Sequence, residues 1–281
     1  MSVVRIDAHQ HFWSPEHADY GWLRDTPELH AIYRAFAPAD LAPLLDNAAI
    51  DATVLVQAAP SEAETARLLA IAADPANRVR AVVGWTDFAA ADAPRRISRL
   101  AQEPLLKGLR PMLQDLPDPE WILDARLEPA IRTMTELGLC LDLLIKPHQI
   151  DAVTKFALRH PLLPMVIDHA AKPDIAQGRF EPWASQIATF ARSTRVSCKL
   201  SGLATEAGAD WDAAALQPYV DHLVSHFGPS RLMWGSDWPV LNLAGSYGQW
   251  HGASLELLAN LSPLEQEQIL GTNAATFYGI K

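Results

Sequence analysis

Short apolar runs recur along the whole chain, and each is followed by a longer segment whose apolar residues have helical spacing. Eight of these runs are rich in Val, Ile or Leu, as expected of strands that are covered on both faces. The predicted strands are Val4–Ala8, Thr53–Gln57, Ala81–Trp85, Leu106–Arg110, Cys140–Ile145, Pro164–Asp168, Val196–Leu200 and Leu232–Ser236.

The segments between the strands have the periodicity of amphipathic helices. Some begin with a capping signal, such as Ser61 followed by Glu64 three residues later. The predicted helices include Ser61–Asp74, Ala93–Ala101, Leu127–Leu137, Pro147–Arg159, Pro182–Arg192 and Trp211–Phe227. Alternating strands and helices predict a parallel sheet of the α/β class, and eight units predict closure into a (βα)8 TIM barrel.

An open, doubly wound sheet is the alternative architecture. It would require a glycine-rich phosphate turn after an early strand, and neither G-x-G-x-x-G nor G-x-x-x-x-G-K-[ST] occurs in the sequence. No Pro-, Gly- or Ser-rich linker divides the chain, and barrels of this type occupy about 250 residues as one domain. We therefore expect residues 1–281 to form a single barrel domain.

One long segment, Phe12–Ala37, interrupts the alternation directly after the first strand. It is rich in aromatic residues, which are Phe12, Trp13, Tyr20, Trp22, Tyr33 and Phe36. Long connections of this kind are commonly functional and lie over the site that they serve. We predict a lid-like insertion over the mouth of the barrel.

The amino-acid composition excludes some classes of binding partner. Hydrophobic residues make up 49% and charged residues 20%, as in a globular protein, and the net charge of −10 argues against nucleic acid or an anionic membrane as a partner. We find neither a signal-peptide pattern nor a run of about 18 apolar residues. Cys140 and Cys198 are expected to be buried small apolar residues of a cytoplasmic protein. The oligomeric state is left open.

The first strand ends in the motif Asp7-Ala8-His9-Gln10-His11. Because side chains alternate across a strand, His9 and His11 are expected on one face, together with Asp7. Two imidazoles aimed at one point suit a metal ion, a polarised carbonyl or a proton relay. Active sites of such barrels lie at the carboxyl ends of the strands, although a strand that runs out into polar surface would give the same pattern.

Polar residues also stand at the ends of later strands. His169 follows the sixth strand, Asp237 follows the eighth, Arg110 ends the fourth, and Lys199 lies within the seventh. Charged groups in apolar strands are costly unless they are paired or functional. Asp237 shares a face with the small residue Gly235, which leaves room for water or substrate.

Each of these residues also has a structural interpretation. His169 fits a core histidine bonded to a carbonyl, and Lys199 fits an ion pair with Asp142 inside the barrel. Asp168 precedes His169 on the opposite strand face, so we expect it to orient a neighbouring loop. Trp85 stands at a strand end, where an indole can stack on a sugar ring.

Together these motifs resemble the amidohydrolase superfamily, and in particular its lactonase group, which includes L-fuconolactonases and pyrone dicarboxylate lactonase. The resemblance spans nearly the whole chain. Its signatures are Asp7-Ala8-His9-Gln10-His11-Phe12-Trp13, Tyr20-Gly21-Trp22-Leu23, Lys107-Gly108-Leu109-Arg110, Ile167-Asp168-His169, Cys198-Lys199-Leu200-Ser201-Gly202, Trp234-Gly235-Ser236-Asp237-Trp238-Pro239 and Gly271-Thr272-Asn273-Ala274-Ala275.

The resemblance implies that Asp237 is the general base and that His9, His11 and His169 contact the substrate carbonyl or a metal. No strand-end lysine suits a carbamate bridge between two metals, because Asp142 lies where such a group would be sought. Some of the lactonases that this chain resembles work without a metal. We therefore expect no strictly required cofactor, and either one divalent cation such as Zn at these four residues or a purely protonic site.

The expected reaction is the hydrolysis of a sugar lactone, L-fucono-1,5-lactone or a related aldono-1,4- or 1,5-lactone, to the aldonic acid by Asp-activated water. A serine nucleophile is not expected, because no G-x-S-x-G motif is present. The expected substrate contacts are Arg110, Lys199, Trp238, Trp85 and Trp22. The alternatives are a metal-dependent decarboxylase, a hydrolase of an aromatic or dicarboxylate lactone, and a sugar-binding protein without chemistry.

Overall fold

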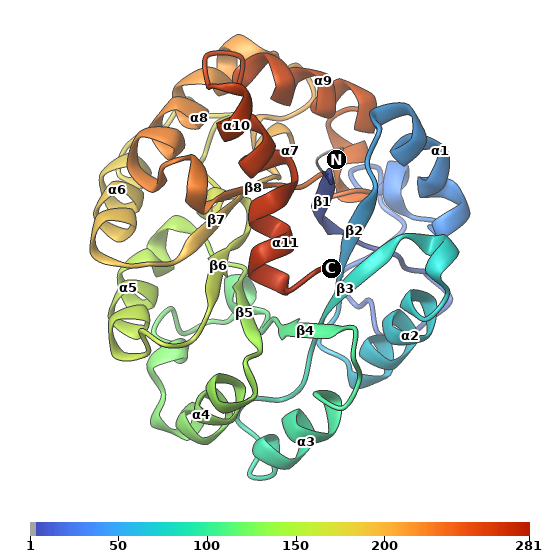
Figure 1. The fold of residues 1–281 in the computed structure, drawn as a ribbon, viewed down its shortest axis with the longest axis vertical. Helices are drawn as coiled ribbons and strands as arrows, with labels where there is room; N and C mark the ends of the chain where they lie inside the picture. Colours follow the sequence, from blue (N-terminus) through green and yellow to red (C-terminus); the bar gives the residue numbers. More distant parts are fainter. Residues whose placement is uncertain (1–3) are drawn as a thin grey trace.

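A computed structural model describes residues 4–281 of the chain (Figure 1). Its eight strands form one sheet in sequence order, and every neighbouring pair is parallel. The strands are β1 Ile6–Gln10, β2 Ala52–Val56, β3 Val79–Gly84, β4 Leu106–Leu109, β5 Cys140–Leu143, β6 Met165–Ile167, β7 Ser197–Leu200 and β8 Leu232–Trp234. The predicted (βα)8 TIM barrel is confirmed, and each predicted strand agrees with the observed one to within two residues.

The sheet closes through the loop that follows β8. The backbone N–H of Asp237 donates to the carbonyl of His9 over 2.8 Å, and the N–H of His11 donates to the carbonyl of Trp238 over 2.7 Å. These bonds join the end of β8 to the end of β1. They therefore hold Asp237 beside the two histidines through the backbone alone.

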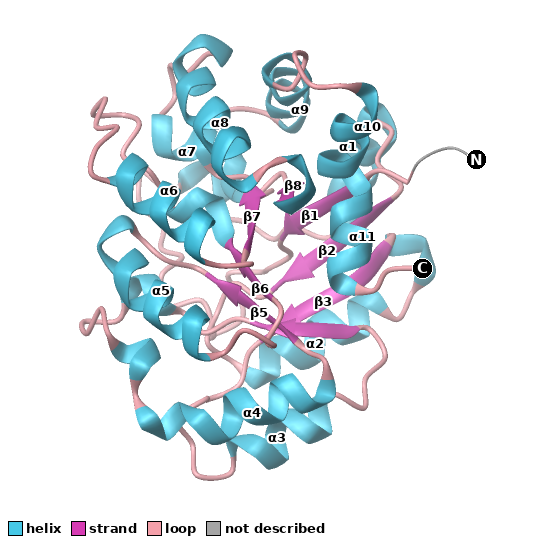
Figure 2. Cartoon of the chain, turned by 60° about the vertical axis from the view of Figure 1, so that its left-hand side comes forward, coloured by secondary structure: helices cyan, strands magenta, loops and turns pink. Residues whose placement is uncertain are grey.

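Helices surround the barrel (Figure 2). They are α1 Pro38–Ala48, α2 Glu62–Ala72, α3 Ala93–Leu100, α4 Glu128–Leu137, α5 Ile150–Arg159, α6 Trp183–Ser193, α7 Leu203–Ala207, α8 Ala213–Phe227, α9 Tyr247–Leu257, α10 Pro263–Glu267 and α11 Asn273–Tyr278. All six predicted helices are present. Within residues 4–281, no helix has the length and apolar character required to cross a membrane.

Side chains along each strand point alternately into the barrel and toward the surrounding helices, so the apolar core has two parts. One apolar cluster fills the barrel interior and includes Ile6, Ala8, Val54 and Val83. The other lies between the strands and the surrounding helices. Helix α11 lies across one end of the barrel (Figure 1), and its Tyr278 belongs to the interior cluster. The polar site is therefore built at the other end of the interior, where the strands end.

The insertion between β1 and α1 is attached to the loop after β2 and to α2. Its only regular element among the described residues is a short 3-10 turn, His30–Ile32. The indole N–H of Trp22 donates to the carbonyl of Ala58 over 2.8 Å, and Asp19 pairs with Arg67 on α2. These contacts place the insertion at the carboxyl end of the strands, as a lid requires.

Candidate active site

A bulge in β1 aims the two histidines into the barrel. Asp7 is paired with Thr53 of β2, whereas Gln10 is paired with Leu55, so β1 carries one extra residue in this interval. The extra residue breaks the alternation after Ala8. As a result, His9 and His11 both point into the interior.

The expectation that Asp7 shares a face with these histidines is wrong, because the alternation on which it rested is interrupted. The carboxylate of Asp7 accepts hydrogen bonds from the backbone N–H of Ser236 over 2.8 Å and from the hydroxyl of Tyr247 on α9 over 3.0 Å. Burial raises the pKa of Asp7 to about 6, against the effect of these donors. Asp7 therefore links β1 to β8 and α9 rather than joining the site.

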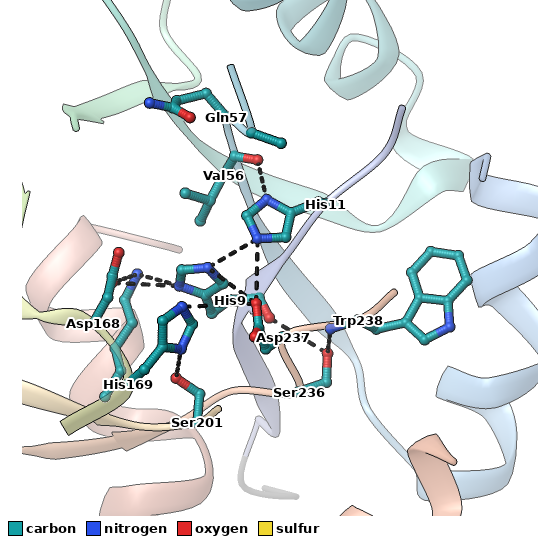
Figure 3. A network of polar contacts seen from close by, with 12 residues as sticks. His9, His11, Val56, Gln57, Asp168, His169, Ser201, Ser236, Asp237 and Trp238 are labelled. Carbon is teal, nitrogen blue, oxygen red and sulfur yellow. Dashed lines mark hydrogen bonds and ion pairs between the residues drawn. The ribbon is translucent and has the colours of Figure 1, made fainter. Parts of the chain in front are cut away.

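The structure brings His9, His11, His169 and Asp237 together around one point (Figure 3). Asp237 Oδ1 lies 3.3 Å from His11 Nε2 and 3.7 Å from His169 Nε2. His9 Nε2 lies 3.7 Å from the same oxygen and 3.1 Å from His11 Nε2. All four side chains are buried. One carboxylate oxygen is thus surrounded by three imidazole nitrogens.

Two of these four residues, Asp237 and His169, have a left-handed backbone conformation. Asp237 has a φ of 57°, and His169 has a φ of 52° as the first of four residues in this conformation. The His169 ring also needs the glycine at position 202, because a Cβ there would lie 2.8 Å from the ring. The Ser201 hydroxyl lies 2.8 Å from His169 Nδ1 and orients the ring.

The same backbone turn corrects the expectation for Asp168. Because β6 ends at Ile167 and the chain then turns left-handed, Asp168 and His169 do not take opposite strand faces. Asp168 Oδ1 lies 3.0 Å from Lys199 Nζ, and its Oδ2 accepts a hydrogen bond from Arg110 Nη1 over 2.9 Å. Asp168 is therefore part of the polar interior of the barrel and does not orient a loop.

Lys199 lies below the histidines and is fully buried. Its Nζ contacts Asp142 Oδ2 at 2.5 Å, Asp168 Oδ1 at 3.0 Å and His9 Nδ1 at 3.1 Å. The structural ion pair between Lys199 and Asp142 is thus present. The ammonium thus makes hydrogen-bond contacts with Asp142 and His9 and an ion pair with Asp168 inside the barrel.

The guanidinium of Arg110 is also hydrogen-bonded mainly to other groups of the protein. Its guanidinium donates to Asp168 and to the backbone carbonyl of Gln57, and Nη1 lies 3.5 Å from His9 Nε2. The Gln57 amide in turn donates to the carbonyl of Arg110 over 2.8 Å. Nε of Arg110 is buried and has no partner among residues 4–281.

A cavity of about 610 Å³ lies between the insertion and the loops that follow β2, β3 and β4, and none of His9, His11, His169 and Asp237 lines it. Trp22 of the insertion and Trp85 after β3 line it, together with Trp121 and Met112. Trp238 is a packing residue instead: its ring is 2% exposed and lies against Phe12 and Phe36 of the insertion at centroid distances of 6.0 and 5.2 Å. Of the three tryptophans expected to contact substrate, two face the cavity.

Lys172 and Glu206 form a pair near the site that was not predicted. They follow β6 and β7, and Lys172 Nζ lies 3.4 Å from Glu206 Oε1. Burial raises the pKa of Glu206, Lys172 opposes this shift, and the nearby charge of Asp237 adds to it. Their nearness to two strand-end motifs was the available signal, but charged loop residues are more often on the surface.

The protonation states follow from burial. Burial lowers the pKa of His169 to about 4 and that of His9 well below its usual 6.5. Burial alone would raise the pKa of Asp237, but His169 and the other two imidazoles outweigh it and hold that pKa below its usual value. At neutral pH, His9 and His169 are therefore uncharged, and Asp237 is an ionised carboxylate.

The donor set fits one divalent cation of the zinc type, which prefers imidazole nitrogen and carboxylate oxygen. His9, His11 and Asp237 form one group with suitable atoms within 4.8 Å of one another. His11 Nδ1 lies 2.7 Å from the carbonyl of Val56 and must donate to it, which leaves the lone pair of Nε2 directed at the centre. His9, His11 and Asp237 are the residues that would hold such an ion, and His169 Nε2 lies 3.7 Å from the same carboxylate oxygen.

A parallel barrel with His-x-His on its first strand, a histidine after the sixth and an aspartate after the eighth has the architecture of an amidohydrolase. The amidohydrolase family matches residues 6–280, and this chain belongs to it.

The chain is 47% identical to an L-fucono-1,5-lactonase of Burkholderia ambifaria, over 99% of this chain and 96% of the relative. An L-fucono-1,5-lactonase of Burkholderia multivorans is 35% identical, over 100% of this chain and 97% of the relative. A crystal structure of an amidohydrolase from Burkholderia multivorans with bound Zn has a TM-score of 0.90 at 35% identity, covering 99% of this chain and 100% of that chain.

Proposed function

We propose that the protein is a lactonase that hydrolyses L-fucono-1,5-lactone to the open-chain aldonic acid. The observation that carries this proposal is the position of the Asp237 carboxylate amid three imidazole nitrogens at the carboxyl ends of the strands. Identity of 47% and 35% to two L-fucono-1,5-lactonases over nearly their full lengths supports the choice of substrate.

Asp237 is the general base of the reaction. A water hydrogen-bonded to this carboxylate attacks the lactone carbonyl carbon, and Asp237 takes the proton of that water as the new C–O bond forms. An imidazole N–H donates to the carbonyl oxygen while it carries the negative charge, and one such donor contributes about 10²–10³ in rate. The ring C–O bond then breaks, and Asp237 returns the proton to the leaving alkoxide.

A zinc ion held by His9, His11 and Asp237 would supply Lewis-acid polarisation of the carbonyl and a more acidic water. Asp237 holds the nucleophilic water in either case. Without a metal, the imidazoles contact the carbonyl oxygen.

The cavity favours a neutral sugar over a dicarboxylate. Trp22 and Trp85 offer faces on which a sugar ring can stack, and Asp19, Asp87 and Asp115 give the cavity an acidic lining. A dicarboxylate would need free cations, but Arg110 and Lys199 are already paired with buried carboxylates. Hydroxyl groups, in contrast, can bond to acidic side chains directly.

The decisive experiment is a panel of lactones assayed by proton release. We expect the highest kcat/KM for L-fucono-1,5-lactone, lower values for aldono-1,4-lactones, and negligible turnover of 2-pyrone-4,6-dicarboxylate. A preference for the dicarboxylate would overturn the proposal. Release of CO₂ from an aromatic acid that stops on chelation would establish the decarboxylase alternative, and sugar binding without turnover of any lactone would establish a binding protein.

A further inference from the structure

Lys172 and Glu206 form an ion pair that the reaction described above does not use. Lys172 follows β6, Glu206 lies on α7 after β7, and Lys172 Nζ is 3.4 Å from Glu206 Oε1. The two side chains are 25 and 26% exposed, whereas His169 and Asp237 are buried. A small molecule in solution can therefore reach the pair.

The backbone holds Lys172 beside His169. The four residues from His169 to Lys172 all have a φ between 52° and 58°, and the N–H of Lys172 donates to the carbonyl of His169 over 2.8 Å. The indole N–H of Trp183 on α6 donates to the carbonyl of Ala170 inside this turn over 2.7 Å. A left-handed backbone is costly for residues with a Cβ, and such strain is kept mainly where it positions functional groups. The turn therefore fixes where the Lys172 side chain begins relative to His169.

Glu206 is tied to the surroundings of the same imidazole by the loop after β7. Its N–H donates to the carbonyl of Gly202 over 3.0 Å, and a Cβ at Gly202 would lie 2.8 Å from the His169 ring. Its carbonyl accepts a hydrogen bond from the N–H of Ala176, in the loop after β6, over 3.0 Å. Burial raises the pKa of Glu206, and the nearby charge of Asp237 adds to that shift. Both members of the pair are therefore anchored next to His169.

An ammonium beside a carboxylate suits a hydroxyl group. The ammonium only donates hydrogen bonds, the carboxylate only accepts them, and a hydroxyl group does both. Because Nζ and Oε1 are 3.4 Å apart, one hydroxyl group can accept from Lys172 and donate to Glu206 at the same time. A carboxylate of a substrate in the same place would be repelled by Glu206 and by Asp237. The pair therefore selects a neutral, hydroxylated part of a ligand.

We propose that Lys172 and Glu206 form the subsite for the hydroxyl group at C2 of the lactone. In the reaction proposed above, the imidazoles contact the carbonyl oxygen, and C2 is bonded to the carbonyl carbon. The hydroxyl group at C2 is therefore the one that a pair anchored next to His169 meets. This subsite, whose ligand depends on the proposed lactone hydrolysis, narrows the substrates to lactones with a hydroxyl group at C2.

The subsite is tested by comparing kcat/KM for L-fucono-1,5-lactone and for its 2-deoxy analogue, both assayed by proton release. We expect the wild-type protein to prefer the 2-hydroxy lactone by about 10- to 10²-fold, because the 2-deoxy lactone lacks a hydrogen bond to charged groups. In the double variant Lys172→Met/Glu206→Gln, which removes one charge of each sign, this preference should fall to about threefold or less. A merely structural pair would lower both values alike and leave the preference unchanged.

The matched control is Lys155→Met/Glu120→Gln, which removes an exposed lysine–glutamate pair with an N–O distance of 3.1 Å. This control should keep the wild-type preference for the 2-hydroxy lactone. Thermal unfolding of each protein checks the fold. Where Lys172→Met/Glu206→Gln does not fold, Glu206→Gln alone replaces it, with the same loss of preference as the expected result.

Equal kcat/KM values of the wild-type protein for the two lactones would overturn the subsite and leave the proposed lactonase function standing. A preference that the folded variant retains in full would do the same. Inactivity of the wild-type protein on every sugar lactone would refute the proposed function and the subsite together.

Discussion

His9 packs directly against the backbone of Gly235. A Cβ at position 235 would lie 2.8 Å from His9 Cβ and 3.1 Å from the His9 backbone nitrogen. Neither of these His9 atoms can move without shifting β1. The small residue that directly follows β8 therefore sets where the imidazole of His9 lies.

We expect Gly235→Ala to lower kcat/KM about 10²-fold, because displacement of a reacting group by about 1 Å has this effect. Steady-state kinetics on the best lactone measure it. Gly248→Ala is the control, since a Cβ there meets no atom within 4 Å and alanine suits the helix α9. Activity of Gly235→Ala within about threefold of wild type would show that the contact with His9 is not critical.

Asp237→Asn should reduce kcat by about 10³-fold or more, because the amide cannot take a proton from water. Asparagine tolerates the left-handed backbone at this position, where φ is 57°, so the fold should be retained. Circular dichroism and thermal unfolding check the fold. Turnover within about tenfold of wild type would contradict the assignment of the base.

The acid limb of the pH–rate profile should lie well below the ordinary titration of histidine. Because burial lowers the pKa of His169 to about 4, from 6.5, this imidazole stays uncharged until the solution is quite acidic. We expect kcat/KM to be level from about pH 8 to about pH 5 and to fall below that. A half-maximum near pH 6.5 in buffers of constant ionic strength would contradict this expectation.

Glu64 should make the protein less stable as the pH rises. Burial raises its pKa to about 7, from 4.5, although the N–H groups of Ala58 and Ala59 oppose the shift. A raised pKa gives stability below pH 4.5 that is lost as the pH passes 7, by about 3 kcal/mol in the free energy of unfolding. In urea unfolding at about pH 5 and about pH 8, Glu64→Gln should lack this loss.

The control for this measurement is Glu136→Gln, on the exposed face of α4. Its unfolding free energy should follow that of the wild type at both pH values. An equal pH dependence in Glu64→Gln and the wild type would show that the Glu64 carboxyl does not carry the effect.

Trp85→Ala should raise KM about fivefold with a smaller change in kcat, because loss of an aromatic stacking contact costs about 1 kcal/mol. Trp85→Phe keeps an aromatic face and should stay close to wild type. Equal KM values in all three proteins would place the sugar elsewhere in the cavity.

The strands were predictable because each is a short β-branched or leucine-rich run with a helix after it. The meeting of the residues at the strand ends was predictable from the topology. Parallel strands in a barrel bring their carboxyl ends to one side, so His9 and Asp237 meet although 228 positions separate them in the chain.

What could not be predicted is where the backbone is irregular. The positions of Asp7 and Asp168 were wrong because strict alternation was assumed across a bulge and into a left-handed turn. The ring of Trp238 is buried by Phe12 and Phe36 of the insertion, and no local pattern shows how that insertion folds back.

The extra residue in β1 makes the histidine pair a property of the backbone as much as of two side chains. On a regular strand with Ile6 and Ala8 facing inward, His9 and His11 would both point at the surrounding helices. A designer who transplanted the two residues alone into another barrel would obtain an outward-facing pair. A one-residue deletion in this strand would likewise direct the side chains of His9 and His11 away from the barrel interior, although both imidazoles would still be present.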